Sequence, residues 1–299
     1  LMGWKLAPAL AAGNTIIMKP SEITSTSLLH WAEIVGDIMP PGVLNVITGY
    51  GTEAGEEIVK HPSVPIITFT GSVKTGKRIA MHAAENLKKI SLELGGKDPV
   101  IICDDADIDV AAKGTSWGGF VNSGQVCTSI ERVYVFSNIA DRFTESLVEE
   151  SKKVKLGDPM DKDTDIGPMA SKAQLKNTVE KVALAKEQGA RILIGGHRPK
   201  EFARGYFFSP TIFDRVRPDM EIVTEESFSP VIPVQKVDSL DEAIKMSNAT
   251  KYGLGCTIFT RDIERAMNAA DKIKSGTVCI NSPLMENIAA PFGGMKQSG

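Results

Sequence analysis

Cys127 is the cysteine whose sequence context best suits a nucleophile. It follows the polar, glycine-containing residues 122–125 (NSGQ), which indicate a loop or helix end beside a site. A cysteine thiolate attacks a carbonyl carbon well near neutral pH, so this position could form a covalent acyl intermediate. A buried core thiol is the alternative interpretation. We adopt that alternative for the three cysteines that lie in apolar runs, Cys103, Cys256 and Cys279.

Glu93 is a candidate general base. It interrupts the apolar run of residues 90–94, so it is either a strand-edge residue or a partly buried carboxylate with a raised pKa. A carboxylate of that second kind can take a proton from water near neutral pH. Glycines follow at positions 95 and 96. Our hypothesis is that they give the Glu93 side chain room to move between two positions.

Residues 71–77 (GSVKTGK) follow a predicted strand and open a predicted helix, where parallel α/β sheets commonly bind anions. Their spacing also fits the G-x-x-x-x-G-K half of a P-loop, and residues 100–104 (VIICD) imitate a Walker B strand. An NTPase is therefore an alternative. Against it, Arg78 stands where a P-loop carries the hydroxyl that ligates Mg²⁺. A glycine turn that binds no ligand is a further alternative.

Short apolar, β-branched runs alternate with amphipathic stretches, which predicts an α/β fold. The first series has strands at 14–18, 43–47, 65–69 and 90–94, and helices at 24–37, 53–60 and 75–87. The second has strands at 100–103, 133–136, 191–194, 231–237, 256–260 and 277–280, and helices at 107–120, 140–153, 175–188, 240–249 and 262–273. We expect two Rossmann-like domains with mostly parallel open sheets, residues 1–95 and 96–299.

The composition of the 299 residues is that of a globular protein, with 42% hydrophobic and 24% charged residues. A net charge of −3 gives no case for nucleic acid or an anionic membrane as partner. No apolar run reaches the roughly 20 residues that span a bilayer. Four cysteines without a CxxC pair predict free thiols in a reducing, cytoplasmic compartment, and four scattered histidines predict no metal site.

Six segments, in order, resemble the motifs of the aldehyde dehydrogenase superfamily, and the resemblance covers nearly the whole chain. They are residues 19–22 (KPSE), 69–76 (FTGSVKTG), 93–97 (ELGGK), 124–127 (GQVC), 225–231 (EESFSPV) and 291–299 (PFGGMKQSG). The separation of 34 residues between Glu93 and Cys127 also suits the family. The resemblance implies a chain that lacks the family's N-terminal region and extreme C-terminus. In agreement with this expectation, the sequence begins with Leu1 rather than methionine and ends at Gly299 within a segment that contains glycine and lysine.

The resemblance implies oxidation of an aldehyde to a carboxylic acid with NAD(P)⁺. Cys127 would form a thiohemiacetal and then a thioester, and Glu93 would activate the water that hydrolyses the thioester. The residues implied to bind the cofactor are Lys19, Glu22, Gly51, Gly71, Ser72, Gly76, Leu94, Glu226 and Phe228. Glu22 beside the adenosine ribose would favour NAD, with NADP also used, because a carboxylate repels the 2′-phosphate of NADP.

The resemblance also places Trp4, Trp117, Val126 and Thr128 at the substrate pocket. It implies a homodimer or homotetramer of the full-length protein and a small aldehyde as substrate. Two alternatives are not catalytic. One is an inactive scaffold, which retention of both Cys127 and Glu93 argues against. The other is that the 299 residues are inactive by themselves, because the family's oxyanion asparagine is expected before Leu1.

Ser227 and Ser229 depart from the family's pattern, which usually shows an apolar residue and a glycine at these two positions.

Overall fold

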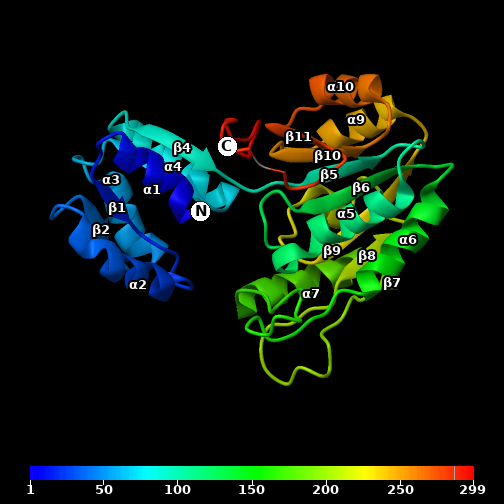
Figure 1. Cartoon of the computed structure of the whole chain (residues 1–299), viewed down its shortest axis with the longest axis horizontal. Coiled ribbons are helices and arrows are strands. Elements are labelled where there is room, and N and C mark those ends of the chain that lie inside the picture. Colours follow the sequence, from blue (N-terminus) through cyan, green and yellow to red (C-terminus); the bar gives the residue numbers. More distant parts are fainter. Residues whose placement is uncertain (286) are drawn as a thin grey trace. The chain divides into compact units, whose positions relative to one another are not determined.

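A computed structural model, which describes residues 1–285 and 287–299, shows two compact units, Leu1–Glu93 and Leu94–Gly299 (Figure 1). The first unit consists of parallel strand pairs joined through helices. Strand β1 pairs with β2, and β3 pairs with β4. The elements are α1 (Met2–Ala11), β1 (Ile16–Met18), α2 (Ser25–Val35), β2 (Leu44–Val46), a π-helix (Gly51–Gly55), α3 (Glu56–Lys60), β3 (Ile66–Thr70), α4 (Val73–Glu85) and β4 (Lys89–Glu93).

The four strands predicted for this first unit are therefore present and parallel. Among the described residues they form two separate pairs rather than one sheet. Helix α1 has no counterpart in the sequence-based prediction, which began its first element at residue 14.

The second unit contains a seven-stranded sheet with the order β11-β10-β5-β6-β9-β8-β7. All neighbouring pairs are parallel except β7 with β8, so the prediction of a mostly parallel sheet is confirmed. The elements are β5 (Asp98–Ile102), α5 (Ile108–Phe120), β6 (Ile130–Phe136), α6 (Ala140–Lys152), α7 (Lys172–Glu187), β7 (Arg191–Ile194), β8 (Thr211–Asp214), α8 (Glu221–Thr224), β9 (Val231–Val237), α9 (Leu240–Asn248), β10 (Gly255–Phe259), α10 (Ile263–Lys272) and β11 (Thr277–Ile280).

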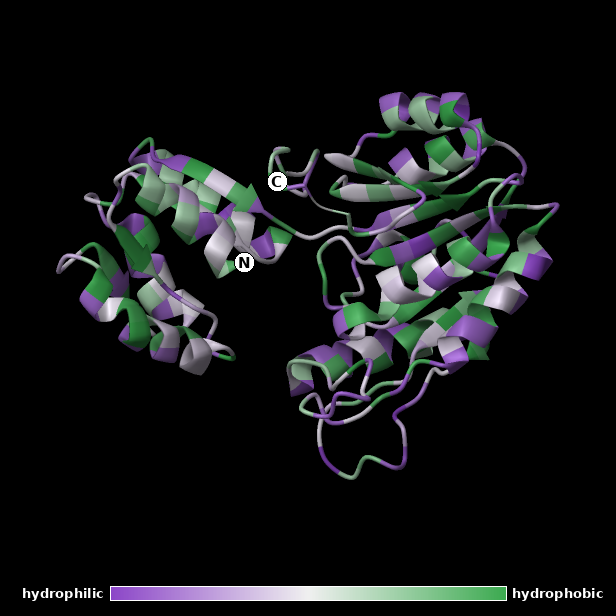
Figure 2. Ribbon diagram, viewed as in Figure 1, coloured by the Kyte–Doolittle hydropathy of each residue, from purple (hydrophilic) through white to green (hydrophobic). Residues whose placement is uncertain are grey.

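Helices cover both faces of this sheet. Helices α5 and α6 lie on one face, while α9 and α10 lie on the other (Figure 1). Every residue of β5, β6 and β10 is buried as a result. This explains the consecutive apolar residues in these strands, such as residues 100–102 of β5, which do not alternate with polar ones; Figure 2 shows green stretches along the sheet.

The parallel direction of the strands decides where the predicted motifs meet. Residues 94–97 precede β5, residues 124–129 precede β6, and residues 225–230 precede β9. Parallel neighbours begin at the same edge of a sheet, so these three segments lie along one amino edge. Strand β8 and the short helix α8, which the sequence analysis did not predict, lie in the stretch that leads to the third segment.

The core of this unit predicts a contrast between two methionines. Met220 is fully buried, whereas Met160 is 91% exposed. Met220→Ala should lower the free energy of unfolding by about 2–5 kcal/mol, because it removes buried apolar surface and leaves a cavity. Met160→Ala should change it by less than about 0.5 kcal/mol. Urea denaturation followed by circular dichroism measures both, and equal losses would contradict this description of the core.

Candidate active site

In the first unit, two predicted cofactor residues lie just beyond the carboxyl end of β1. Lys19 follows the strand directly, and its Nζ donates to the carbonyl oxygens of Pro20 at 2.7 Å and Gly49 at 2.9 Å. Glu22 is exposed, and Gly51 begins the π-helix after β2. Ligands of parallel α/β sheets bind at this end of the strands, so the positions suit a ribose.

The turn after β3 carries Gly71 and Ser72. Ser72 caps α4, because its Oγ accepts from the backbone N–H of Thr75 at 3.3 Å. Gly76 lies one turn further on, and its N–H donates to the carbonyl oxygen of Ser72 at 2.9 Å. The N–H of Gly71 donates to the carbonyl oxygen of Glu93 at 3.0 Å, so this turn lies beside the end of β4. A strand end that faces a helix N-terminus suits a phosphate group.

The P-loop alternative finds no support at this turn. Arg78, in the position of the metal-ligating hydroxyl, forms an ion pair with Glu56 of α3. Glu56 also pairs with Lys60 at 2.6 Å and lies 3.4 Å from His82. Arg78 therefore ties α4 to α3.

Glu93 is the last residue of β4 and lies opposite Thr70 of β3. Burial raises the pKa of its carboxyl group, and the positive charge of Lys5 acts in the opposite direction. Its Oε2 is buried and accepts no hydrogen bond from the described part of the chain. A partly buried carboxylate with a raised pKa and an unused acceptor atom has the properties of a base for water.

Lys5 is a residue that the sequence analysis missed. Its Nζ donates to Oγ1 of Thr68 at 2.7 Å, which ties α1 to β3. Burial lowers the pKa of Lys5, and the carboxylate of Glu93 partly offsets that effect. The sequence did indicate that Lys5 has a specific partner, since it is the only charged residue among the first 18 residues.

Cys127 lies in the second unit, half-buried in the loop between α5 and β6. The residues just before it, Asn122, Ser123 and Gly124, all have positive φ angles of 53°, 57° and 69°. A Cβ atom at Gly124 would also collide with the carbonyl oxygen of Ser229. Asparagine, serine and glycine at these positions tolerate the left-handed backbone conformation, and the glycine also allows residue 124 to approach Ser229 closely.

The Cys127 loop meets two further motif segments at the amino edge of the sheet. A Cβ atom at Gly96 would lie 2.6 Å from the carbonyl oxygen of Cys127. The N–H of Gly96 donates to Oε1 of Glu226 at 3.2 Å. The segment that contains Gly96 begins at Leu94, the first residue of the second unit. The segments around Gly96, Cys127 and Glu226 are thus brought together.

The electrostatic surroundings of Cys127 favour its protonated form. Burial, with smaller contributions from the neighbouring Asp98 and Glu226, raises the pKa of the thiol to about 11. Asp98 is itself buried, and burial raises the pKa of its carboxyl group well above the usual range. Burial also raises the pKa of Glu226 to about 7. At neutral pH the sulfur therefore carries a proton.

The other cysteines lie in or next to strands. Cys103 follows β5 and Cys256 lies in β10, both buried, whereas Cys279 of β11 is half-buried. The core assignment is confirmed for the first two.

Three of the four predicted substrate residues lie around the Cys127 loop. Val126 and Thr128 flank Cys127 and are half-buried. Trp117 is 52% exposed on α5, one residue before Gly118, whose carbonyl oxygen accepts from Oγ of Ser129 at 3.1 Å. The fourth, Trp4, is 55% exposed on α1 of the first unit.

The C-terminal motif is attached to the beginning of the second unit. The N–H of Leu94 donates to the carbonyl oxygen of Ser298 at 2.8 Å, and Oγ of Ser298 accepts from the N–H of Gly253 at 3.0 Å. Residues 291–299 thereby help to fix the amino edge of the sheet.

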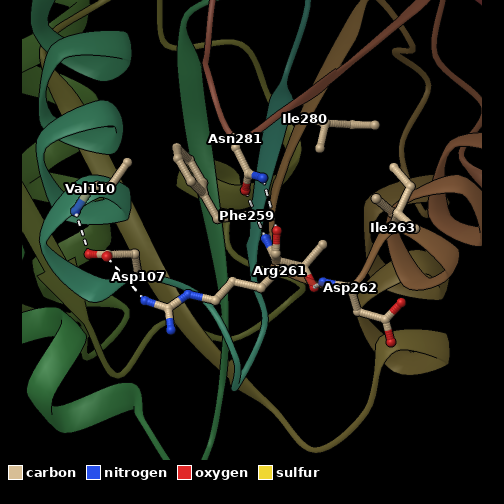
Figure 3. A pocket seen from close by; sticks show the side chains of 10 residues that line it. Asp107, Val110, Phe259, Arg261, Asp262, Ile263, Ile280 and Asn281 are labelled. Carbon is tan, nitrogen blue, oxygen red and sulfur yellow. Dashed lines mark hydrogen bonds and ion pairs between the residues drawn. The ribbon is translucent and has the colours of Figure 1, made fainter.

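A hollow of about 410 Å³ lies at the opposite edge, at the carboxyl ends of β5, β10 and β11 (Figure 3). Asp107 there accepts from Arg261 at 3.1 Å, and the carboxamide of Asn281 bonds both backbone groups of Thr260 at 2.9 Å. No predicted site residue lines this hollow. Its polar groups are paired with one another, which is typical of a supporting network.

Within the described residues, no group of three or more histidine, cysteine or carboxylate side chains is arranged to hold a metal ion. No helix in that part of the chain has the length and apolar character required to cross a bilayer.

The chain belongs to the aldehyde dehydrogenase family, whose sequence pattern it matches over residues 1–299. It is 44% identical over 297 residues to a chloroplastic aminoaldehyde dehydrogenase of Arabidopsis thaliana and 41% identical to a chloroplastic betaine aldehyde dehydrogenase of Beta vulgaris. Each match covers 99% of this chain and 59% of the relative, so the chain spans about three-fifths of the relatives' length.

Solved structures of aldehyde dehydrogenases have the same fold as this chain. A betaine aldehyde dehydrogenase of Staphylococcus aureus in complex with NAD⁺ superposes with a TM-score of 0.96 at 41% identity, over 99% of this chain and 59% of that one. The lactaldehyde dehydrogenase of Escherichia coli has a TM-score of 0.96 at 42% identity, over 99% and 62% of the two chains.

The high pKa of Cys127 predicts how fast the thiol is alkylated. Without cofactor, its reaction with iodoacetamide should accelerate about tenfold per pH unit between pH 7 and 10, because only the thiolate reacts. Mass spectrometry of the peptide that carries Cys127 gives the rate, and Cys127→Ser is the control for labelling elsewhere. A rate that levels off below pH 9 would show that the pKa is not raised.

Proposed function

We propose that the protein oxidises an aldehyde to the corresponding carboxylic acid with NAD⁺ as the oxidant. The observation that carries the proposal is the half-buried Cys127, in the loop where three motif segments of this aldehyde dehydrogenase family member meet. The activity is proposed for the whole protein, because the chain spans about three-fifths of its relatives.

Cys127 acts as the nucleophile. Its sulfur bonds to the aldehyde carbon, the thiol proton leaves, and the carbonyl oxygen becomes the hydroxyl of a thiohemiacetal. When bound, NAD⁺ would accept the hydride from the carbon of this species, and loss of the hydroxyl proton to solvent would leave a thioester on Cys127. The proton must leave during attack, since the pKa of the thiol is about 11.

Glu93 acts as the base in the second half of the reaction. Its carboxylate takes a proton from water, whose oxygen bonds to the acyl carbon while the carbon–sulfur bond breaks. The products are the carboxylic acid and the regenerated Cys127 thiol. The raised pKa of Glu93 and its unused Oε2 support this role. The proposed motion of its side chain rests on no contact in the structure.

The residues proposed to hold the cofactor lie on both units. Lys19, Glu22 and Gly51 would bind the adenosine ribose, and Gly71, Ser72 and Gly76 the pyrophosphate. Leu94, Glu226 and Phe228 would bind the nicotinamide end. The exposed strand ends and the capped N-terminus of α4 fit such a ligand, and an NAD⁺ complex is known for the related S. aureus enzyme.

We further propose that residues 1–95 form part of the cofactor domain and residues 96–299 the catalytic domain. A homodimer or homotetramer and a cytoplasmic location complete the proposal. The named substrates of the relatives are an aminoaldehyde, betaine aldehyde and lactaldehyde, so these form the first panel of aldehydes to assay. Trp4, Trp117, Val126 and Thr128 are proposed to contact the aldehyde.

Two variants separate the roles of Cys127 and Glu93. Cys127→Ala should abolish NADH formation and leave NAD⁺ binding near normal, because it removes only the nucleophile. Glu93→Gln should give a burst of NADH followed by slow turnover, because the thioester forms but hydrolyses slowly. Stopped-flow absorbance and mass spectrometry of the acyl-enzyme test this in the full-length protein. Turnover by Cys127→Ala, or a Glu93→Gln variant with neither burst nor acyl-enzyme, would refute the assignments.

Glu22 should set the cofactor preference. We expect the protein to favour NAD⁺, and Glu22→Ser to raise the ratio of kcat/KM for NADP⁺ to that for NAD⁺, because a carboxylate that repels the 2′-phosphate is removed. The matched control is Glu57→Ser, which removes another exposed carboxylate of the first unit. A ratio that stays constant in Glu22→Ser, or moves equally in both variants, would contradict the role.

A further inference from the structure

The segment 225–230 holds an unfavourable backbone conformation. Phe228 has a φ angle of 48°, which is rare for a bulky residue and requires support from its surroundings. This segment is also where Ser227 and Ser229 depart from the family's pattern. Its support comes from side chains on other elements.

Glu131 of β6 supports the segment from one side. Its side chain is buried, with an exposed fraction of 3%. Oε2 accepts from the backbone N–H of Ser227 at 2.7 Å, and Oε1 accepts from the backbone N–H of Phe228 at 2.7 Å. The two carboxylate oxygens thus accept from two consecutive backbone N–H groups. Both hydrogen bonds are short and charge-assisted, and together they fix the direction of the backbone.

Lys97 provides the balancing charge. Its Nζ, fully buried, donates to Oε2 of Glu131 at 2.7 Å and to Oγ of Ser227 at 2.9 Å. Burial lowers the pKa of Lys97, and the adjacent Glu131 partly offsets that effect. The serine hydroxyl satisfies a buried ammonium proton, which an apolar side chain at this position could not do. This gives a physical reason for the departure at Ser227.

Gln174 of α7 supports the segment from the other side. Its Nε2 donates to the carbonyl oxygens of Ser227 at 3.1 Å and Phe228 at 2.7 Å. Both N–H groups and both carbonyl groups of these two residues are therefore bonded to side chains. The flanking residue Glu226 bonds to the N–H of Gly96.

We propose that Glu131 is a positioning residue for the cofactor. By holding the N–H groups of Ser227 and Phe228, its carboxylate fixes Glu226 and Phe228 in the conformation that binds the nicotinamide end of NAD⁺. Lys97, which donates to both Glu131 and Ser227, holds that carboxylate in place. The inference rests on the proposed function, because it assigns the purpose of the network to cofactor binding.

The test is binding of NAD⁺ without aldehyde, measured by isothermal titration calorimetry on the full-length protein. Glu131→Gln, nearly the same shape, should raise the Kd for NAD⁺ at least about tenfold, because the amide offers one acceptor oxygen in place of two. Hydrogen exchange of residues 226–230 should accelerate in the same variant. Ser227→Ala keeps both backbone contacts and should raise the Kd less.

Two controls separate positioning from stability. Leu147→Ala empties a fully buried site on α6, which should lower stability while the Kd for NAD⁺ stays within about twofold. If Glu131→Gln leaves Lys97 unpaired and does not fold, the double variant Lys97→Met with Glu131→Gln removes both charges. It should fold and still bind NAD⁺ weakly.

The outcomes are distinguishable. A full-length protein that binds NAD⁺ and a Glu131→Gln variant that binds it equally well would overturn the inference and leave the proposed function standing. A rise in Kd of the same size in Leu147→Ala would overturn it too, because stability alone would then explain the effect. A full-length protein that binds no NAD⁺ and oxidises no aldehyde would overturn the proposed function and the inference with it.

Discussion

The parallel direction of strands β5, β6, β9 and β10 is the constraint on which the second unit depends. Parallel strands begin together at one edge of a sheet, and that edge collects segments separated by more than a hundred residues of sequence. A buried segment before a strand belongs to no ladder, so its backbone groups need other partners, such as side chains. The buried carboxylate of Glu131, bonded to Ser227 and Phe228, meets this requirement.

The two sides of the peptide bond between Glu93 and Leu94 are held by different hydrogen bonds. The carbonyl oxygen of Glu93 accepts from Gly71 within the first unit, while the N–H of Leu94 donates to Ser298 within the second. The proposed base is therefore the last residue of one unit, and its neighbour is the first residue of the other.

The sequence predicted the fold class, most strands and the motif segments, because apolar periodicity and glycine punctuation are local properties. Strand β8 was missed, although the equally short strands β7 and β11 were predicted. The positive φ angles around Asn122 and the role of Glu131 depend on distant partners, so no local pattern reveals them. Glu131 also lay outside the strand predicted at 133–136, so the sequence analysis did not identify it as a charge within a buried strand.

The protonated state of Cys127 has a consequence outside the reaction. Peroxides oxidise thiolates far faster than thiols, so a sulfur with a pKa of about 11 resists conversion to sulfenic acid and the irreversible acids beyond it. Asp98, buried beside the loop, adds to this resistance by opposing the thiolate charge. The same burial that keeps the proposed nucleophile protonated thus slows its oxidation.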